Sequence, residues 1–125
     1  MNPHVVLIID DETDICFLLG KVLSEKKYVV SMAGSLAEGF TKLKEVDPFI
    51  LFLDIRLPDG SGLDALIEIR KKNPLLKIIM MSAYDGEKER KTAFERGADL
   101  FISKPLNMEL INLNLQNIQS KFEKK

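Results

Sequence analysis

The chain has 125 residues, of which 46% are hydrophobic and 30% are charged, and its formal net charge is −1. This length suits one domain with its own core, and the composition is that of a globular rather than a disordered protein. A net charge so close to zero gives no reason to expect binding to nucleic acid or to an anionic membrane. The single cysteine, Cys16, and the lack of a signal peptide or a long apolar run predict a reduced, cytoplasmic setting.

The first half of the chain alternates between strand-like and helix-like patterns. Residues 4–9 form a continuous apolar run, which is typical of a strand buried on both faces. Apolar residues at helical spacing follow over residues 15–23. A second strand is predicted at residues 28–32, and the capping-box pattern from Ser35 to Glu38 then opens the second helix.

The same alternation continues through the second half of the chain. Three more apolar runs predict strands at residues 49–53, 76–81 and 100–103. Helices are predicted over residues 62–72, 86–96 and 108–122. Alternating strands and helices favour an α/β fold with a parallel sheet and helices on both faces. We therefore expect a single domain over residues 1–125.

Polar side chains follow four of the predicted strands. In chain order they are Asp10, Asp11, Glu12, Asp54, Ser82 and Lys104. In open parallel sheets, ligands bind beyond the carboxyl ends of the strands, so these groups are candidates for one site. Clustered carboxylates suit a hard cation such as Mg²⁺, and a carboxylate can act as the nucleophile that forms an aspartyl phosphate. Lys104 and the metal would neutralise the moving phosphoryl group, and Ser82 would donate a hydrogen bond to it.

Each of these residues also has a purely structural interpretation. Asp11 or Thr13 would serve as a helix cap, and Lys104 would be an ordinary loop lysine. Asp54 is harder to explain in this way, because it ends an apolar strand where no capping role is evident. Together, polar groups at four strand ends favour a functional site.

Four segments resemble one known family, in order and at its spacing. They are Ile8-Ile9-Asp10-Asp11-Glu12, Leu53-Asp54-Ile55-Arg56-Leu57-Pro58, Met81-Ser82-Ala83 and Ser103-Lys104-Pro105. The resemblance is to the receiver domains of two-component response regulators, which are chiefly bacterial, and it covers essentially the whole chain. It implies a flavodoxin-like, doubly wound sheet of five parallel strands in the order 2-1-3-4-5, with five helices.

The resemblance also implies a role for each site residue. Asp54 would accept a phosphoryl group from a sensor histidine kinase or a phosphotransfer protein, and Lys104 would pair with the phosphate. Ser82 and Phe101 would form the switch pair, and the peptide bond before Pro105 would be cis. The implied cofactor is Mg²⁺, with ligands from Asp10, Asp11, Asp54 and the backbone carbonyl of Arg56.

Two further positions match places that vary in the family and tune the lifetime of the phosphorylated state. They are Arg56, two residues after Asp54, and Tyr84, two residues after Ser82. One hypothesis is that both side chains crowd the attacking water and lengthen that lifetime. The alternative is that both point into solvent and have little effect.

The resemblance places the output surface on the fourth helix, the fifth strand and the fifth helix, through which an output domain or partner protein would be controlled. The fourth helix carries charges of both signs, which suits a symmetric dimer. We therefore expect phosphorylation to favour a homodimer through this surface. The last helix is predicted to face the core through Ile111, Leu115, Ile118 and Phe122.

Other classes of protein fit the sequence less well. A phosphatase with an aspartate nucleophile would need a second aspartate two residues after Asp54, where the chain has Arg56. A flavin-binding module would need a hydroxyl-rich loop after the first strand, where the chain has acidic residues. A degenerate receiver that acts as a phosphorylation-independent interaction module is the remaining alternative. We expect a signalling switch that assists only its own phosphorylation and dephosphorylation, not a turnover enzyme.

Overall fold

The computed structural model describes residues 1–83 and 86–123, with side-chain surroundings as far as residue 118. Five strands form one parallel sheet in the order β2-β1-β3-β6-β7. They are β1 Asn2–Ile9, β2 Val29–Ala33, β3 Pro48–Asp54, β6 Lys77–Ser82 and β7 Leu100–Ser103. Because β4 and β5 form a separate small hairpin, β6 and β7 are the predicted fourth and fifth strands. The predicted α/β class and strand order are therefore confirmed.

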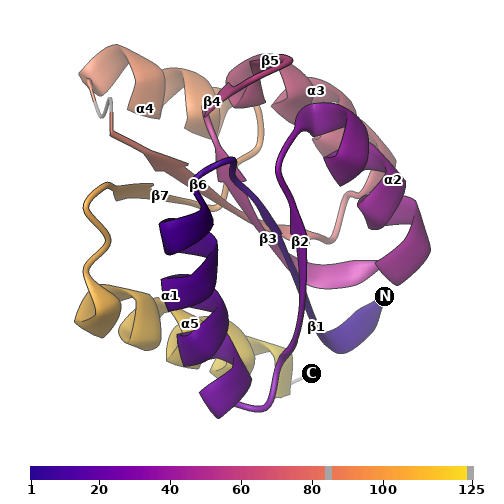
Figure 1. The fold of residues 1–125 in the computed structure, drawn as a ribbon, viewed down its shortest axis with the longest axis vertical. Helices are drawn as coiled ribbons and strands as arrows, with labels where there is room; N and C mark the ends of the chain where they lie inside the picture. Colours follow the sequence, from indigo (N-terminus) through magenta and orange to yellow (C-terminus); the bar gives the residue numbers. More distant parts are fainter. Residues whose placement is uncertain (84–85, 124–125) are drawn as a thin grey trace.

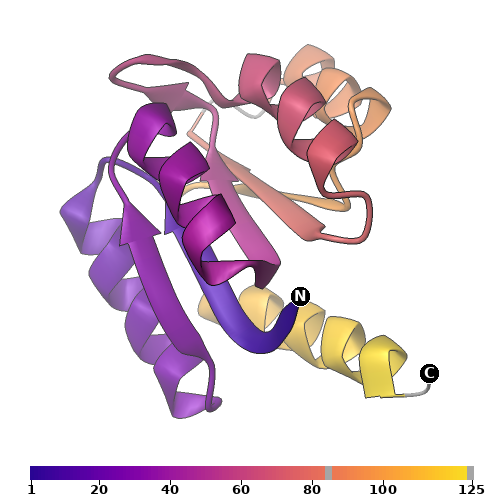
Figure 2. The ribbon, with the colours of Figure 1, turned by 90° about the vertical axis from the view of Figure 1, so that its right-hand side faces the viewer.

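Five helices cover the two faces of this sheet (Figures 1 and 2). They are α1 Thr13–Glu25, α2 Leu36–Val46, α3 Gly62–Lys72, α4 Glu87–Glu95 and α5 Met108–Glu123. Helices α1 and α5 pack on one face, and α2, α3 and α4 pack on the other. Within the described part of the chain, no helix combines the length and the apolar character needed to cross a membrane.

The central strand β3 is buried along its whole length, because helices cover it on both sides. Leu51 and Leu53 point toward the side of α2, α3 and α4, whereas Ile50 and Phe52 point toward α1 and α5. Each of these four side chains is fully buried, which stabilises the fold by roughly 1.5–3 kcal/mol per side chain. The continuous apolar run therefore supplies alternate side chains to the cores on the two faces of the sheet.

The ends and faces of the helices follow the sequence signals closely. The Ser35 hydroxyl accepts a hydrogen bond from the Glu38 amide at 3.2 Å, and the Glu38 carboxylate accepts one from the Gly34 amide at 2.7 Å, which completes the capping box of α2. On α5, Ile111, Leu115 and Ile118 are buried as predicted. The side chain of Phe122 lies outside the described residues.

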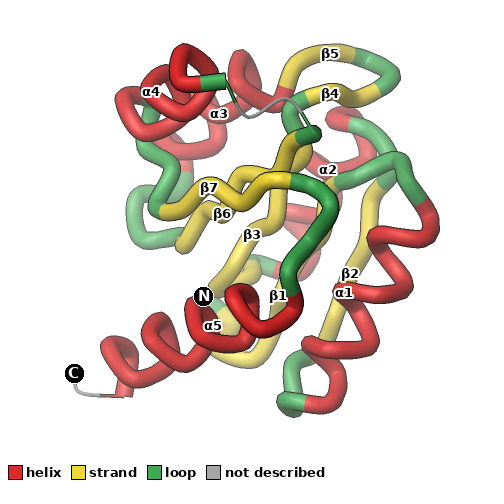
Figure 3. The backbone as a smooth tube through the Cα atoms, turned by 90° about the vertical axis from the view of Figure 1, so that its left-hand side faces the viewer, coloured by secondary structure: helices red, strands yellow, loops and turns green. Residues whose placement is uncertain are grey.

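A small hairpin between β3 and α3 is absent from the sequence prediction. It consists of β4 Arg56–Leu57 and β5 Gly60–Ser61 and extends from the carboxyl end of β3 (Figure 3). At its tip, the Asp59 carboxylate accepts hydrogen bonds from the amides of Leu36 and Ala37 at 2.8 and 2.9 Å. The hairpin therefore caps the amino terminus of α2, where helix dipoles favour a negative charge.

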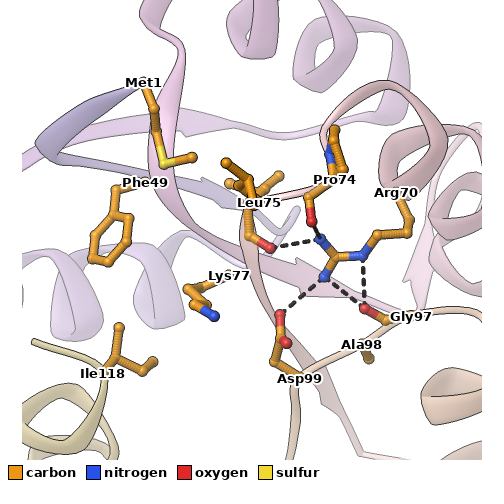
Figure 4. Close-up of a pocket in the computed structure, with 11 residues that line it drawn as sticks. Met1, Phe49, Arg70, Pro74, Leu75, Lys77, Gly97, Ala98, Asp99 and Ile118 are labelled. Carbon is orange, nitrogen blue, oxygen red and sulfur yellow. Dashed lines mark hydrogen bonds and ion pairs between the residues drawn. The ribbon is translucent and has the colours of Figure 1, made fainter. Parts of the chain in front are cut away.

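A cavity of about 390 Å³ lies at the amino ends of β3 and β6, far along the sheet from the predicted site (Figure 4). Beside it, the Arg70 guanidinium forms an ion pair with Asp99 at 2.9 Å. The same guanidinium donates hydrogen bonds to the backbone carbonyls of Asn73, Pro74, Leu76 and Gly97. Arg70 thus joins the end of α3 to the turns before β6 and β7, and its donors are occupied by the protein itself.

Candidate functional site

Strand register brings the predicted polar groups to one edge of the sheet. Because the strands are parallel, Ile9 aligns with Leu53, Asp54 with Met81 and Ser82 with Ser103. The residues that end or follow β1, β3, β6 and β7 therefore come together. In Figure 3 this edge lies beside the β4–β5 hairpin and the amino-terminal end of α4.

Lys104 is the centre of this cluster. Its ammonium nitrogen lies 2.9 Å from Asp10 Oδ2, 2.8 Å from Glu12 Oε1 and 3.2 Å from Asp54 Oδ2. The side chains of Lys104, Asp10 and Asp54 are 7%, 0% and 8% exposed, whereas that of Glu12 is 57% exposed. One buried cation thus holds two buried carboxylates and one carboxylate at the surface.

The local backbone fixes the carboxylates in place. The Glu12 amide donates a hydrogen bond to Asp10 Oδ1 at 2.8 Å, and the Arg56 amide donates one to the Asp54 carboxylate. Behind Asp54, a side chain at position 62 would collide with the Asp54 carbonyl, so Gly62 allows α3 to begin directly against the backbone of β3. Its amide donates a hydrogen bond to the Ile55 carbonyl at 2.6 Å.

The electrostatics of the cluster are unbalanced toward negative charge. Burial, followed by the nearby charge of Asp10, raises the pKa of Asp54 to about 6, although Lys104 opposes this shift. Burial disfavours the charged form of Lys104, yet hydrogen bonds to Glu12 and Asp10 and the charge of Asp54 outweigh it and raise the pKa of the ammonium. Lys104 therefore stays charged at neutral pH, and it alone does not compensate three carboxylates.

The donor set fits a hard divalent cation. Oxygen atoms of Asp10, Glu12 and Asp54 all lie within 4.8 Å of one another, and clustered carboxylate oxygens are the ligands that Mg²⁺ prefers. The sequence places Asp10, Asp11 and Glu12 together as site candidates, and the family resemblance implies Asp10 and Asp11 as the metal ligands. Among the described residues, this cluster contains Glu12 and not the exposed Asp11.

The other predicted site residues lie around the cluster. Ser82 is buried at the end of β6 and Phe101 is buried in β7. The Lys104–Pro105 peptide bond is cis. Arg56 is exposed on β4, and Tyr84 lies outside the described residues.

The fold and the cluster together define a class of protein. It is a doubly wound α/β domain with two buried aspartates, an exposed glutamate and a lysine at the carboxyl edge of the sheet. Such a site offers a carboxylate nucleophile beside charges that can neutralise a phosphoryl group.

Comparison with known proteins identifies the family. The family model described as the response regulator receiver domain matches residues 6–116. The chain therefore belongs to the response regulator receiver domains of two-component systems. Members of this family are in general phosphoacceptors and not turnover enzymes.

The curated relatives are longer proteins. The probable transcriptional regulatory protein TcrX of Mycobacterium tuberculosis is 30% identical over 92% of this chain and 49% of its own length. The alkaline phosphatase synthesis transcriptional regulatory protein PhoP of Bacillus subtilis is 29% identical over 98% of this chain and 51% of its own length. The chain thus spans about half the length of these relatives.

Solved structures show the same fold over almost the whole chain. A CheY-like receiver domain from Methanospirillum hungatei has a TM-score of 0.88 at 27% identity and covers 99% of this chain and 100% of its own. The beryllofluoride-activated receiver domain dimer of NtrC4 also has a TM-score of 0.88, at 28% identity, covering 95% of this chain and 98% of its own.

Proposed function

We propose that this chain is a phosphoacceptor switch that takes a phosphoryl group on Asp54 from a sensor histidine kinase or a phosphotransfer protein. The observation that carries the proposal is the geometry of Asp54. Its buried carboxylate ends the central strand, 3.2 Å from the Lys104 ammonium and beside Asp10. A nucleophile in this position attacks beside a fixed cation that can neutralise part of the charge on the incoming phosphoryl group.

In the transfer, a bond forms between an Asp54 carboxylate oxygen and phosphorus, while the phosphorus–nitrogen bond of the donor histidine breaks. The histidine keeps the electron pair of that bond. Lys104 neutralises charge on the phosphoryl oxygens, and the Ser82 hydroxyl donates a hydrogen bond to one of them. Lys104 is well suited to this task because its ammonium already reaches Asp54, Asp10 and Glu12.

Bound Mg²⁺ would supply further neutralisation of the phosphoryl oxygens. We assign its ligands to the carboxylates of Asp10, Asp11 and Asp54 and to the backbone carbonyl of Arg56. The excess of carboxylates around Lys104 supports Asp10 and Asp54 as ligands, whereas Asp11 is proposed from the family resemblance. The surface position of Glu12 allows it to adjust to the cation, because its side chain is more than half exposed.

Phosphorylation then moves the Ser82 hydroxyl toward the phosphate and turns the Phe101 ring inward, which extends the signal to the surface formed by α4, β7 and α5. A phosphate adds about two negative charges and several hydrogen-bond acceptors, which is enough to bias a two-state element. We also propose that Arg56 and Tyr84 lengthen the phosphorylated lifetime. Arg56 is exposed on β4, which is also what the alternative of a solvent-facing side chain with little effect requires.

We further propose that phosphorylation favours a homodimer through the surface of α4, β7 and α5. Phe94 on α4 is 46% exposed, and Leu110 and Leu113 on α5 are 44% and 53% exposed, so this surface combines apolar side chains with charges of both signs. Light scattering with beryllofluoride and Mg²⁺ tests the proposal. A Leu113→Ser variant should stay monomeric, and a parent that also stays monomeric at high concentration would contradict it.

Intact mass after incubation with acetyl phosphate and Mg²⁺ tests the central proposal. The parent should gain one phosphoryl group, and Asp54→Asn should gain none. Asp64→Asn is the matched control, since Asp64 is an exposed aspartate on α3, and it should behave as the parent. A parent that gains no mass from acetyl phosphate or from any phosphohistidine donor would favour a degenerate receiver that acts through protein contacts alone.

A further inference from the structure

The aromatic residue of the proposed switch has a cation stacked on it. The Arg90 guanidinium carbon lies 4.8 Å from the centroid of the Phe101 ring. This distance is within the range of cation–π attraction, and arginine forms such stacks because its planar head is weakly hydrated. Arg90 belongs to α4 and Phe101 to β7, so the contact joins two elements of the output surface.

The ring beneath this guanidinium is in its inward position. Phe101 is only 7% exposed, and it belongs to the core cluster that includes Met80, Ala93 and Ala98. Arg90 itself is half-buried. It therefore covers the side of the ring that would otherwise meet solvent.

A second contact fixes the guanidinium. Arg90 Nη2 donates a hydrogen bond to Ser103 Oγ at 3.4 Å, which is at the long end of the hydrogen-bond range. Ser103 immediately precedes Lys104, the cation that holds Asp54. Arg90 thus contacts both the aromatic ring and the residue next to the centre of the site.

We propose that Arg90 is a positioning residue that holds the Phe101 ring inward and so sets the resting balance of the switch. This inference rests on the proposed function, in which the inward ring accompanies the phosphorylated state. A chain that already favours the inward ring needs less free energy from phosphorylation to complete the change. The resting protein is thereby poised toward its signalling conformation.

Fluorine NMR of 4-fluorophenylalanine placed at position 101 tests this inference. The ratio of buried to exposed ring should fall about two- to fivefold in Arg90→Gln, the factor that corresponds to one partly exposed cation–π contact. Arg90→Lys should lose less, because it keeps the charge without the planar stack. Lys91→Gln is the matched control, since Lys91 is an exposed cation one residue further along α4, and its ratio should equal that of the parent.

An unchanged ratio in Arg90→Gln, or an equal fall in Lys91→Gln, would overturn the inference. These measurements are made without phosphate or metal, so they do not depend on phosphoryl acceptance. Addition of beryllofluoride and Mg²⁺ then tests the proposed function separately, because it should return the ring of Arg90→Gln to the buried state. If beryllofluoride changes the fluorine signal in no variant, the proposed function is contradicted. The role of Arg90 in the resting protein is then still decided by the ratio of buried to exposed ring in Arg90→Gln against that in the parent.

Discussion

Two cations with little exposure lie near opposite ends of the same sheet, and their surroundings differ in kind. At the carboxyl end, Lys104 is surrounded by carboxylates that repel one another. At the amino end, Arg70 pairs with Asp99 and otherwise donates to backbone carbonyls. The first set of partners carries excess charge and can be rearranged by a ligand, whereas the second is nearly neutral and already satisfied.

This difference separates the cluster around Lys104, which can bind a ligand, from the contacts of Arg70, which only stabilise the fold. A planar guanidinium suits several fixed carbonyls at once, whereas a compact ammonium on a flexible stem can follow carboxylates or phosphate oxygens. Removing Arg70 should therefore change stability above all, and changing the carboxyl-end cluster should change both stability and chemistry.

The largest effect is expected at Arg70. Arg70→Ala should lower the free energy of unfolding by about 3 kcal/mol, because it leaves Asp99 without its cation and several carbonyls without donors. Arg70→Lys should recover little, since an ammonium cannot reach these partners together. Urea unfolding measures the loss. Folded Arg70→Ala should still accept a phosphoryl group. Loss of this reaction in the folded variant would contradict the view that Arg70 serves stability alone.

Asp54→Asn should change the free energy of unfolding in the opposite direction and stabilise the metal-free protein at pH 7 by about 2 kcal/mol. The pKa of Asp54 is raised to about 6 from an ordinary value of 3.8, so the folded state binds more protons than the unfolded state between these values. Parent stability should therefore fall as pH rises from about 4 to 6 and then level off. Thermal unfolding across this range should show a flatter dependence for Asp54→Asn; an equally steep fall would contradict it.

Lys104→Gln should cost about 1–2 kcal/mol at pH 7 without metal, because it leaves two buried carboxylates unneutralised. Mg²⁺ should restore part of the loss, since a divalent cation can take over the neutralisation. Thermal unfolding with and without Mg²⁺ measures this recovery, and Lys72→Gln on the exposed end of α3 provides the control. Equal responses of both variants to Mg²⁺ would count against a metal site at the carboxyl edge.

The smallest effect should be local to the hairpin. Asp59→Ala removes the acceptor of the Leu36 and Ala37 amides, so both should exchange with deuterium faster. The Glu38 amide serves as an internal control, because it is held by Ser35 instead. Uniform acceleration of all three amides would mean that the variant loosens α2 as a whole.

The sequence predicts the sheet well because its strands are long apolar runs with polar residues at their ends. It also predicts that Asp10, Asp54 and Lys104 meet, since parallel strands bring their carboxyl ends together. The hairpin is missed because two-residue strands have no periodicity. The partners of Asp59 are backbone amides more than 20 residues away, and Arg70 bonds to Gly97 and Asp99, which are also distant in sequence. No local pattern reveals these contacts. The sequence offers Asp10, Asp11 and Glu12 as candidates, but one acidic run gives no sign that Glu12 rather than Asp11 reaches Lys104.

The contact between Gly62 and the backbone of Asp54 limits which substitutions this part of the sequence can accept. Any side chain at position 62 would press on the carbonyl of the proposed phosphoacceptor itself, and backbone cannot move aside as a flexible side chain can. In a saturation library of the β4–β5 hairpin and the start of α3, position 62 should tolerate no replacement, whereas the exposed Arg56 should accept many. The position most constrained by its contact with Asp54 would then be a glycine, which has no side chain to take part in the reaction.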